Sequence, residues 1–376
     1  MKRRFSEVLA IINGRNQKKV ENPQGKYPIY GSGGIMGHAD DYLCEENTVI
    51  IGRKGNINKP LFVKEKFWNV DTAFGLAADC KLLHPKYLYY FCCQYDFERL
   101  NKTVTIPSLT KSDLLEIELE LPPLKEQEEV AAKLEQVDLL IDKCRQRIEI
   151  FDMLVKSRFV EMFGTPNEMD KWVCCNVENI ADVTVGLVIK PTQFYTEDTE
   201  NGVKAFRSLN VREMRVNDND WVYFSKEGND QNKKSQVQKG DVLIVRSGYP
   251  GTSCVVTDEY AGCNAIDIMI ARPQRDKINP YYLCAFNNFP HGMNQIRHGT
   301  GGAAQKHFNV GAYNKVIIPV PPIELQNSFV EFLQLTDKSK IAIQKSIGLL
   351  ELLKASLMQT YFGQKKKSAP QGADKD

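Results

Sequence analysis

The 376-residue sequence lacks the long apolar runs and the cysteine spacing of membrane and secreted proteins. A membrane-spanning helix needs about 20 consecutive apolar residues, and no run approaches that length. The basic start of residues 1–16 is followed by a short apolar run broken by Glu7, so a signal peptide is not expected. The ten cysteines include no C-x-x-C pair, which argues against a zinc site and predicts reduced thiols in a cytoplasmic protein.

Signatures of catalysis are also missing. The sequence contains no phosphate-binding loop, no H-E-x-x-H among its five histidines and no G-x-S-x-G turn. The segment NPYY at 279–282 resembles a methyltransferase motif but lacks its second proline. The chain is therefore predicted not to be an enzyme.

Charge of one sign is not in excess either. The 49 basic and 47 acidic side chains leave a net charge of +2, so any nucleic-acid site must come from local patches. Three windows without a single acid supply such patches: 52–64, 99–112 and 291–315. They are basic and rich in Gly, Ser, Thr and Asn, which suits surfaces that face phosphates and base edges. Arginines in or near such patches could also read guanine.

A long internal repeat is present. The run LPPLKEQ from Leu121 recurs as VPPIELQ from Val320, and the match continues without a gap to Phe163 and Phe362. The β-rich sequence before each run matches more weakly, with TVIIGRKG corresponding to DVLIVRSG. The predicted plan is a β-rich domain and a long helix, twice. The expected segments are domain 1 (1–120), helix 1 (121–164), domain 2 (165–319), helix 2 (320–363) and a disordered tail (364–376).

Both long segments have the periodicity of a coiled coil. Apolar residues spaced by three and four form a heptad seam in the first helix: Val130, Leu134, Val137, Ile141, Cys144, Ile148, Phe151 and Val155. In the second helix Thr336 and Lys340 take the places of Val137 and Ile141, which makes that seam less regular.

Six motifs together resemble a known family, the specificity subunit of type I restriction-modification systems. The resemblance covers almost the whole chain, and it depends on the ordered set because each motif alone is loose. The motifs are YPIYGSGGIMG (27–37), TVIIGRKGNINK (48–59), WNVDTAF (68–74), IPSLTKSDLLEIELELPPLKEQ (106–127), GDVLIVRSGYPG (240–251) and VIIPVPPIELQ (316–326).

The resemblance implies an α+β fold. Two β-rich target-recognition domains are each followed by a long helix, and the helices pack as an antiparallel coiled coil with pseudo-twofold symmetry. It further implies that the domains read a bipartite, asymmetric DNA site and that the helices dock two methyltransferase subunits and, through them, restriction or translocase subunits. This chain would bind no cofactor, and S-adenosylmethionine, ATP and Mg would belong to the partners.

Two sets of candidate residues follow from the basic windows, the repeat and the resemblance. The DNA-binding candidates are Ser32, Arg53, Lys54, Lys59, Lys102, Lys111, Arg207, Arg246, Ser247, Tyr249, Arg297 and Lys306. The spacer and subunit-docking candidates are Gln127, Leu134, Ile141, Ile148, Gln326, Leu333, Ile347 and Leu350. An alternative is a coiled-coil adaptor with two protein-binding β-domains, in which the basic loops would be incidental.

Overall fold

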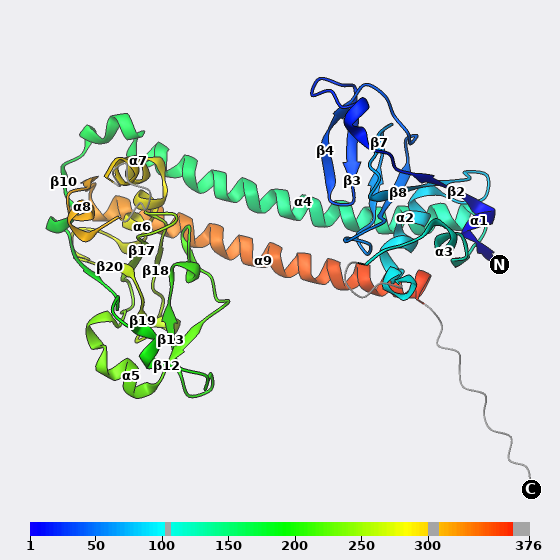
Figure 1. Cartoon of the computed structure of the whole chain (residues 1–376). Helices are drawn as coiled ribbons and strands as arrows, with labels where there is room; N and C mark the ends of the chain where they lie inside the picture. Colours follow the sequence, from blue (N-terminus) through cyan, green and yellow to red (C-terminus); the bar gives the residue numbers. More distant parts are fainter. Residues whose placement is uncertain (102–106, 300–307, 364–376) are drawn as a thin grey trace, which may run out of the picture. The chain divides into compact units, whose positions relative to one another are not determined.

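A computed structural model describes residues 1–101, 107–299 and 308–363. The chain forms two compact units: unit 1 comprises Met1–Gln146 and the chain from Ile343, and unit 2 comprises Arg147–Ala342. Each unit contains β-sheets, short helices and part of both long helices, α4 (Leu124–Phe163) and α9 (Ile323–Phe362) (Figure 1). The expected α+β class, with two β-rich parts each followed by a long helix, is confirmed. The predicted tail lies outside the described residues.

Unit 1 is built on a four-stranded antiparallel sheet with the order β2-β8-β5-β6. A three-stranded sheet, β4-β3-β7, and a two-stranded pair, β1-β9, complete its strands in the described residues. The strands are β1 (Lys2–Arg4), β2 (Leu9–Asn13), β3 (Tyr27–Gly31), β4 (Gly34–Ala39), β5 (Thr48–Gly52), β6 (Leu61–Val63), β7 (Trp68–Asn69), β8 (Ala73–Ala78) and β9 (Glu118–Glu120). The short helices are α1 (Phe5–Val8), η1 (Gln17–Lys19), α2 (Pro85–Gln94), η2 (Phe97–Leu100) and α3 (Lys111–Leu115).

Unit 2 repeats this plan with additions. Its main sheet has the order β11-β20-β17-β18, and its second sheet has the order β12-β16-β13-β19. The strands are β10 (Cys174–Asn176), β11 (Ala181–Val185), β12 (Tyr195–Thr196), β13 (Val203–Phe206), β14 (Val211–Arg212), β15 (Arg215–Val216), β16 (Val222–Phe224), β17 (Val242–Val245), β18 (Ser253–Val255), β19 (Asn264–Ala265), β20 (Ile268–Pro273) and β21 (Ile317–Pro319). The short helices are η3 (Pro166–Lys171), η4 (Val177–Asn179), η5 (Pro191–Phe194), η6 (Ser208–Asn210), α5 (Lys226–Gln231), η7 (Lys233–Ser235), η8 (Asp258–Tyr260), α6 (Pro280–Asn288), α7 (Pro290–Gly299) and α8 (Val310–Asn314).

One of the two inner strands of each main sheet, β5 in unit 1 and β17 in unit 2, is buried on both faces. In β5, Val49 and Ile51 pack into the core beneath α2, whereas Ile50 packs with Cys44 and Phe67 on the other face. The strand β17 divides its side chains between two cores in the same way. Alternating side chains of a strand point to opposite faces, so an unbroken run of β-branched residues is suited to a strand sandwiched between two layers.

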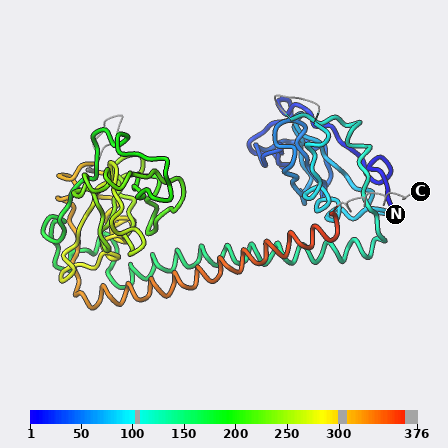
Figure 2. Tube along the Cα trace, turned by 90° about the horizontal axis from the view of Figure 1, so that it is seen from below, coloured from blue at the N-terminus to red at the C-terminus, as the bar shows by residue number. Residues whose placement is uncertain are grey.

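Within each unit the two long helices run antiparallel. In unit 1, Asp138 of α4 pairs with Lys354 of α9, and Arg145 further along α4 pairs with the earlier Glu351. The colours of the trace run in opposite directions along the two helices (Figure 2). The polar seam residues of α9 are satisfied: the Thr336 hydroxyl donates to the Phe332 carbonyl at 2.9 Å, and Lys340 lies 2.9 Å from both Asp152 and Asp337. The irregular seam read from the sequence is therefore stabilised by hydrogen bonds and ion pairs.

A buried glutamine joins each long helix to the β-rich part of its unit. The Gln127 amide donates to the Pro122 and Leu82 carbonyls at 2.8 and 3.0 Å, and its oxygen accepts from the His84 backbone N–H at 2.9 Å. Gln326 repeats all three bonds, to Pro321, Lys277 and Asn279. Both side chains are fully buried. The chain's own backbone already satisfies both amides, and the place of these glutamines in the spacer and subunit-docking set stays a prediction.

Replacing either glutamine by glutamate should destabilise its unit. Gln127→Glu removes both amide donors and buries a charge, leaving two carbonyls unsatisfied. The free energy of unfolding should fall by about 2–4 kcal/mol. Urea unfolding followed by circular dichroism measures this for Gln127→Glu and Gln326→Glu. The exposed Gln136→Glu and Gln334→Glu on the same two helices are the controls, and equal losses in all four variants would contradict this role.

The buried imidazole of His291 packs in unit 2 against the aromatic core around Phe159, with ring centres 5.0 Å apart. Its Nε2 lies 2.8 Å from the Gly164 carbonyl, whereas Nδ1 is buried without a hydrogen bond in the described part of the chain. Burial lowers the pKa of His291 below its usual value, against a smaller opposite effect of the Gly164 carbonyl.

Unit 2 should lose stability as the pH falls through about 6.5, where an unfolded histidine takes up a proton that folded His291 does not. His291→Gln keeps a donor for the Gly164 carbonyl but cannot titrate, so its unfolding free energy should fall less between about pH 7 and pH 5. Denaturant unfolding at several pH values measures the difference. An unfolding free energy of His291→Gln that falls with pH as steeply as that of the wild type would refute the assignment.

Candidate nucleic-acid interface

One edge of unit 1 gathers the ends of several strands. The Arg53 N–H, directly after β5, donates to the Thr72 carbonyl at 2.8 Å, and the Arg15 N–H, after β2, donates to the Asn69 carbonyl at 2.8 Å. Ser32 lies at the same edge beside the end of β5, because a Cβ placed on Gly52 would lie 3.1 Å from the Ser32 Cβ. These backbone contacts bring Arg15, Ser32 and Arg53 to the same edge although the sequence separates them.

The basic side chains of this edge point to solvent. Arg53 is exposed, and its guanidinium lies 5.7 Å from the centre of the Phe74 ring. No ion pair of Arg53, Lys54 or Lys59 is found with the described residues, and both lysines are exposed. An exposed cation without a carboxylate partner is suited to a phosphate or a base edge.

The second basic window of unit 1 contributes less. The Lys111 ammonium donates to the Ile11 carbonyl at 2.7 Å, which ties α3 to β2. Lys102 lies outside the described residues. The backbone of this window still supports the edge, because the Leu109 N–H donates to the Arg53 carbonyl and the Gly55 N–H donates to the Pro107 carbonyl.

Arg246 occupies the place of Arg53 in unit 2, at the end of β17, but its guanidinium is engaged. It lies 2.6 Å from the Asp267 carboxylate, and its Nε donates to the Phe308 carbonyl at 3.3 Å. Its side chain is only 14% exposed. Arg246 thus links three segments of unit 2, whereas Arg53 keeps a free guanidinium among the described residues.

The other candidates of unit 2 differ in exposure. Tyr249 is 82% exposed at the turn between β17 and β18, where its backbone N–H donates to the Ser247 carbonyl at 3.1 Å. Arg207 is turned inward: a terminal guanidinium nitrogen donates to the Asp220 carbonyl, and its Nε is buried. Arg297 is exposed in the last turn of α7. Lys306 lies outside the described residues.

Sequence reasoning missed the residues that reach these edges from elsewhere. Asp267, with a positive φ of 51°, precedes β20 and neutralises Arg246, so an acid-free stretch of sequence is not an acid-free surface. Arg15 was missed because no basic window surrounds it. The sequence offers one signal for Arg15, its position two residues after the apolar run that forms β2.

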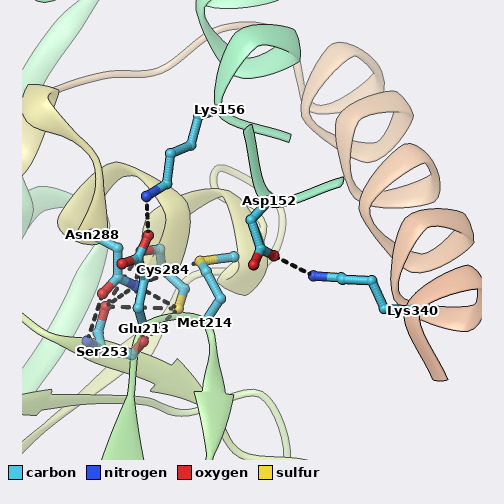
Figure 3. Close-up of polar contacts among 8 residues, drawn as sticks. All are labelled: Asp152, Lys156, Glu213, Met214, Ser253, Cys284, Asn288 and Lys340. Atoms are coloured by element: carbon cyan, nitrogen blue, oxygen red, sulfur yellow. Dashed lines mark hydrogen bonds and ion pairs between the residues drawn. The ribbon is translucent and has the colours of Figure 1, made fainter. Parts of the chain in front are cut away.

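The β14–β15 hairpin of unit 2 contacts both the main sheet and the helix α4 (Figure 3). In this turn between β14 and β15, Glu213 lies 2.7 Å from Lys156 of α4. The next residue, Met214, donates its N–H to the Ser253 carbonyl at 3.0 Å. Asn288 at the end of α6 donates to the Ser253 and Cys284 carbonyls at 2.9 and 2.8 Å. These contacts connect the hairpin to β18, α6 and α4 within one unit.

The cysteines do not form a reactive or metal-binding site in the described residues. All ten are free, and burial raises the pKa of the Cys254 and Cys92 thiols well above the usual value. No group of three or more His, Cys, Asp or Glu side chains is arranged to hold a metal ion in the part of the chain that the structure describes.

The six apolar spacer candidates stand at seam positions of the heptad pattern in the two long helices. Leu134, Ile141 and Leu333 are buried, and Ile148, Ile347 and Leu350 are half-buried. The apolar side chains that solvent reaches are different ones, which the heptad pattern did not select. They lie mainly on the sides of α4 and α9 away from the seam: Leu139, Leu140, Ile150, Met153, Leu154, Leu335, Ile341, Leu349, Leu352 and Leu353. No helix in the described ranges combines the length and apolar content that a membrane crossing requires.

Comparison with known proteins agrees with this architecture. The family described as the type I restriction modification DNA specificity domain matches residues 1–150 and 169–354. The EcoBI specificity subunit of Escherichia coli is 22% identical over 366 residues, covering 86% of this chain and 73% of that subunit. The MjaVIII specificity subunit of Methanocaldococcus jannaschii is 21% identical, covering 94% of this chain and 90% of that subunit.

Solved structures show the same fold. The S subunit of the type I restriction-modification system of M. genitalium has a TM-score of 0.58 at 18% identity, covering 97% of this chain and 96% of that one. A chain from a structure on complex assembly and conformational transition of the type I R-M system has a TM-score of 0.61 at 18% identity, covering 96% and 97%. The chain therefore belongs to the type I restriction-modification DNA specificity family, as a specificity subunit that recognises DNA and is not itself a catalyst.

Proposed function

We propose that each unit of this specificity subunit reads one half of a bipartite, asymmetric DNA site. The observation that carries the proposal is the edge built twice, with β5 and Arg53 in unit 1 and β17 and Arg246 in unit 2. The backbone of the two edges is alike, and the side chains around it differ. Such a pair is suited to two half-sites of different sequence, because backbone contacts position a protein on DNA while side chains read bases.

In this proposal α4 and α9 hold the two units at a defined spacing and dock two methyltransferase subunits. The exposed apolar side chains support docking, since contiguous apolar surface marks sites of protein association. The complex-assembly study of a similar chain gives further support. Restriction or translocase subunits would join through the methyltransferases.

The chemistry would belong to those partners. S-adenosylmethionine, ATP and Mg would be bound by them, and this chain would bind no cofactor. Support comes from the sequence, which has neither a phosphate-binding loop nor a methyltransferase motif.

Methylation sequencing tests the proposal. DNA is taken from a host that expresses this chain with its methyltransferase subunit, or either one alone. We expect a split motif, two specified blocks around a fixed gap, only when both are present. An expressed and assembled pair that adds no such methylated motif would overturn the proposal.

A coiled-coil adaptor without DNA specificity is the second candidate, favoured by the exposed apolar side chains on both long helices. Neutralising the basic residues of both edges in the assembled complex separates the two functions. Site-specific binding that survives this change would favour the adaptor.

Lys54→Ala should weaken binding to every duplex, because an exposed lysine without a carboxylate partner is suited to a phosphate. The slope of log K against log salt should become shallower by about one. Fluorescence anisotropy of the assembled complex over a salt series measures both effects. The exposed Lys81 follows the far end of β8 and is the control, so an equal effect of Lys81→Ala would argue against the edge.

Charging the apolar surface of α9 should impair subunit docking. Leu349 and Leu352 are both 69% exposed in unit 1, so lysine at both positions should leave the fold intact. We expect native mass spectrometry to show loss of at least one methyltransferase subunit, because burying a lysine in an apolar contact is unfavourable. Gln344→Lys, at another exposed position of α9, is the control. Full occupancy in the double variant would exclude this surface.

A further inference from the structure

The corresponding hairpin loops of the two edges differ in chemistry. The loop between β5 and β6 carries Lys54 and Lys59, and the loop between β17 and β18 has no lysine. At its tip the second loop has Tyr249 and Pro250. The two hairpins occupy the same place in equivalent sheets. The unit 1 loop therefore presents lysines where the unit 2 loop presents a tyrosine and a proline.

The backbone holds the Tyr249 loop in a defined shape. The Gly251 N–H donates to the Val245 carbonyl at 3.0 Å, and the Val245 N–H donates to the Thr252 carbonyl at 2.9 Å. Gly248 and Gly251 have φ of 82° and 94°, a region that suits glycine. A Cβ on Gly251 would lie 3.0 Å from Ile296 of α7, so the base of the loop packs on a helix. The exposed ring is therefore carried on an ordered turn, which lowers the entropy lost on binding.

The arginine at the base of this loop is already paired with a carboxylate. Asp267 neutralises Arg246, and the Asp267 N–H donates to the Leu187 carbonyl at 3.1 Å. The two residues after Leu187, Val188 and Ile189, are 54% and 75% exposed. The exposed ring and apolar side chains of this edge are suited to contact the faces of bases.

We propose that unit 2 recognises its half of the DNA by packing Tyr249 against the face of a base at an opened base step. This inference rests on the proposed function and adds that the two units use different chemistry: unit 1 uses cations and hydrogen bonds, and unit 2 uses an aromatic wedge. Because pyrimidine–purine steps unstack most easily, the block read by unit 2 should contain one.

Tyr249→Ala in the full chain, assembled with its methyltransferase subunits, tests the wedge. The probes are a duplex with the motif found by methylation sequencing and two duplexes in which one or the other block is scrambled. Affinity for the intact motif should fall about tenfold with an unchanged salt slope, because a stacking contact is lost and no phosphate contact is. With 2-aminopurine at the step, wild-type binding should raise the fluorescence and Tyr249→Ala should not.

Two variants serve as controls. Tyr249→Phe keeps the ring and should bind as the wild type does. Val173→Ala changes a side chain that is 80% exposed before β10, away from the edge, and should have no effect. Equal melting temperatures of the variants show that a loss of binding is not a loss of fold.

The outcomes separate the two proposals. If the wild-type complex distinguishes the motif from the scrambled duplexes but Tyr249→Ala binds with equal affinity, the wedge is overturned and the proposed function stands. A salt slope that becomes shallower by about one in Tyr249→Ala would also overturn the wedge, because the loop would then bind a phosphate. A wild-type complex that does not distinguish the duplexes would overturn both.

Discussion

Each long helix of this protein is joined to its β-rich part through one buried amide, and the rest of each unit depends on that joint. Gln127 and Gln326 each bond one carbonyl and one N–H of the segment before α2 or α6, and one carbonyl of the turn before their own long helix. A buried polar group without a partner destabilises a fold strongly, so few other residues could stand at these positions. The joint fixes where each helix starts, and with it the direction in which the seam residues face.

Both units contain a main sheet of the same kind, in which one inner strand, β5 or β17, is buried on both faces. Such a strand has little freedom to change, because each of its side chains lies in one of two cores. The loops that follow the strand meet solvent and are free to differ. This division explains how one backbone can carry an open arginine in unit 1 and a neutralised arginine beside an exposed tyrosine in unit 2.

Much of the architecture could be predicted from local sequence. The gap-free repeat and the heptads indicated two long helices, and the sequence before each of them indicated a β-rich domain. The edges could not be predicted to the same depth. Arg53 and Arg246 align in sequence, yet only the fold brings Asp267 to one of them. The two glutamines were identified by their repetition, but their hydrogen bonds within the chain could not be predicted, because a repeated residue looks the same in sequence whether it serves a partner or its own backbone.

The sequence by itself determined the repeat, the periodicity of the helices and the family, because these follow from local patterns and their order along the chain. Tertiary structure alone decided which cations stay free, which apolar side chains stay exposed and which polar groups are satisfied. The physical reason is that charge pairing and burial depend on neighbours in space. For Arg246 that neighbour is an aspartate 21 residues further along the chain, and for Arg15 it is the backbone of a distant strand end.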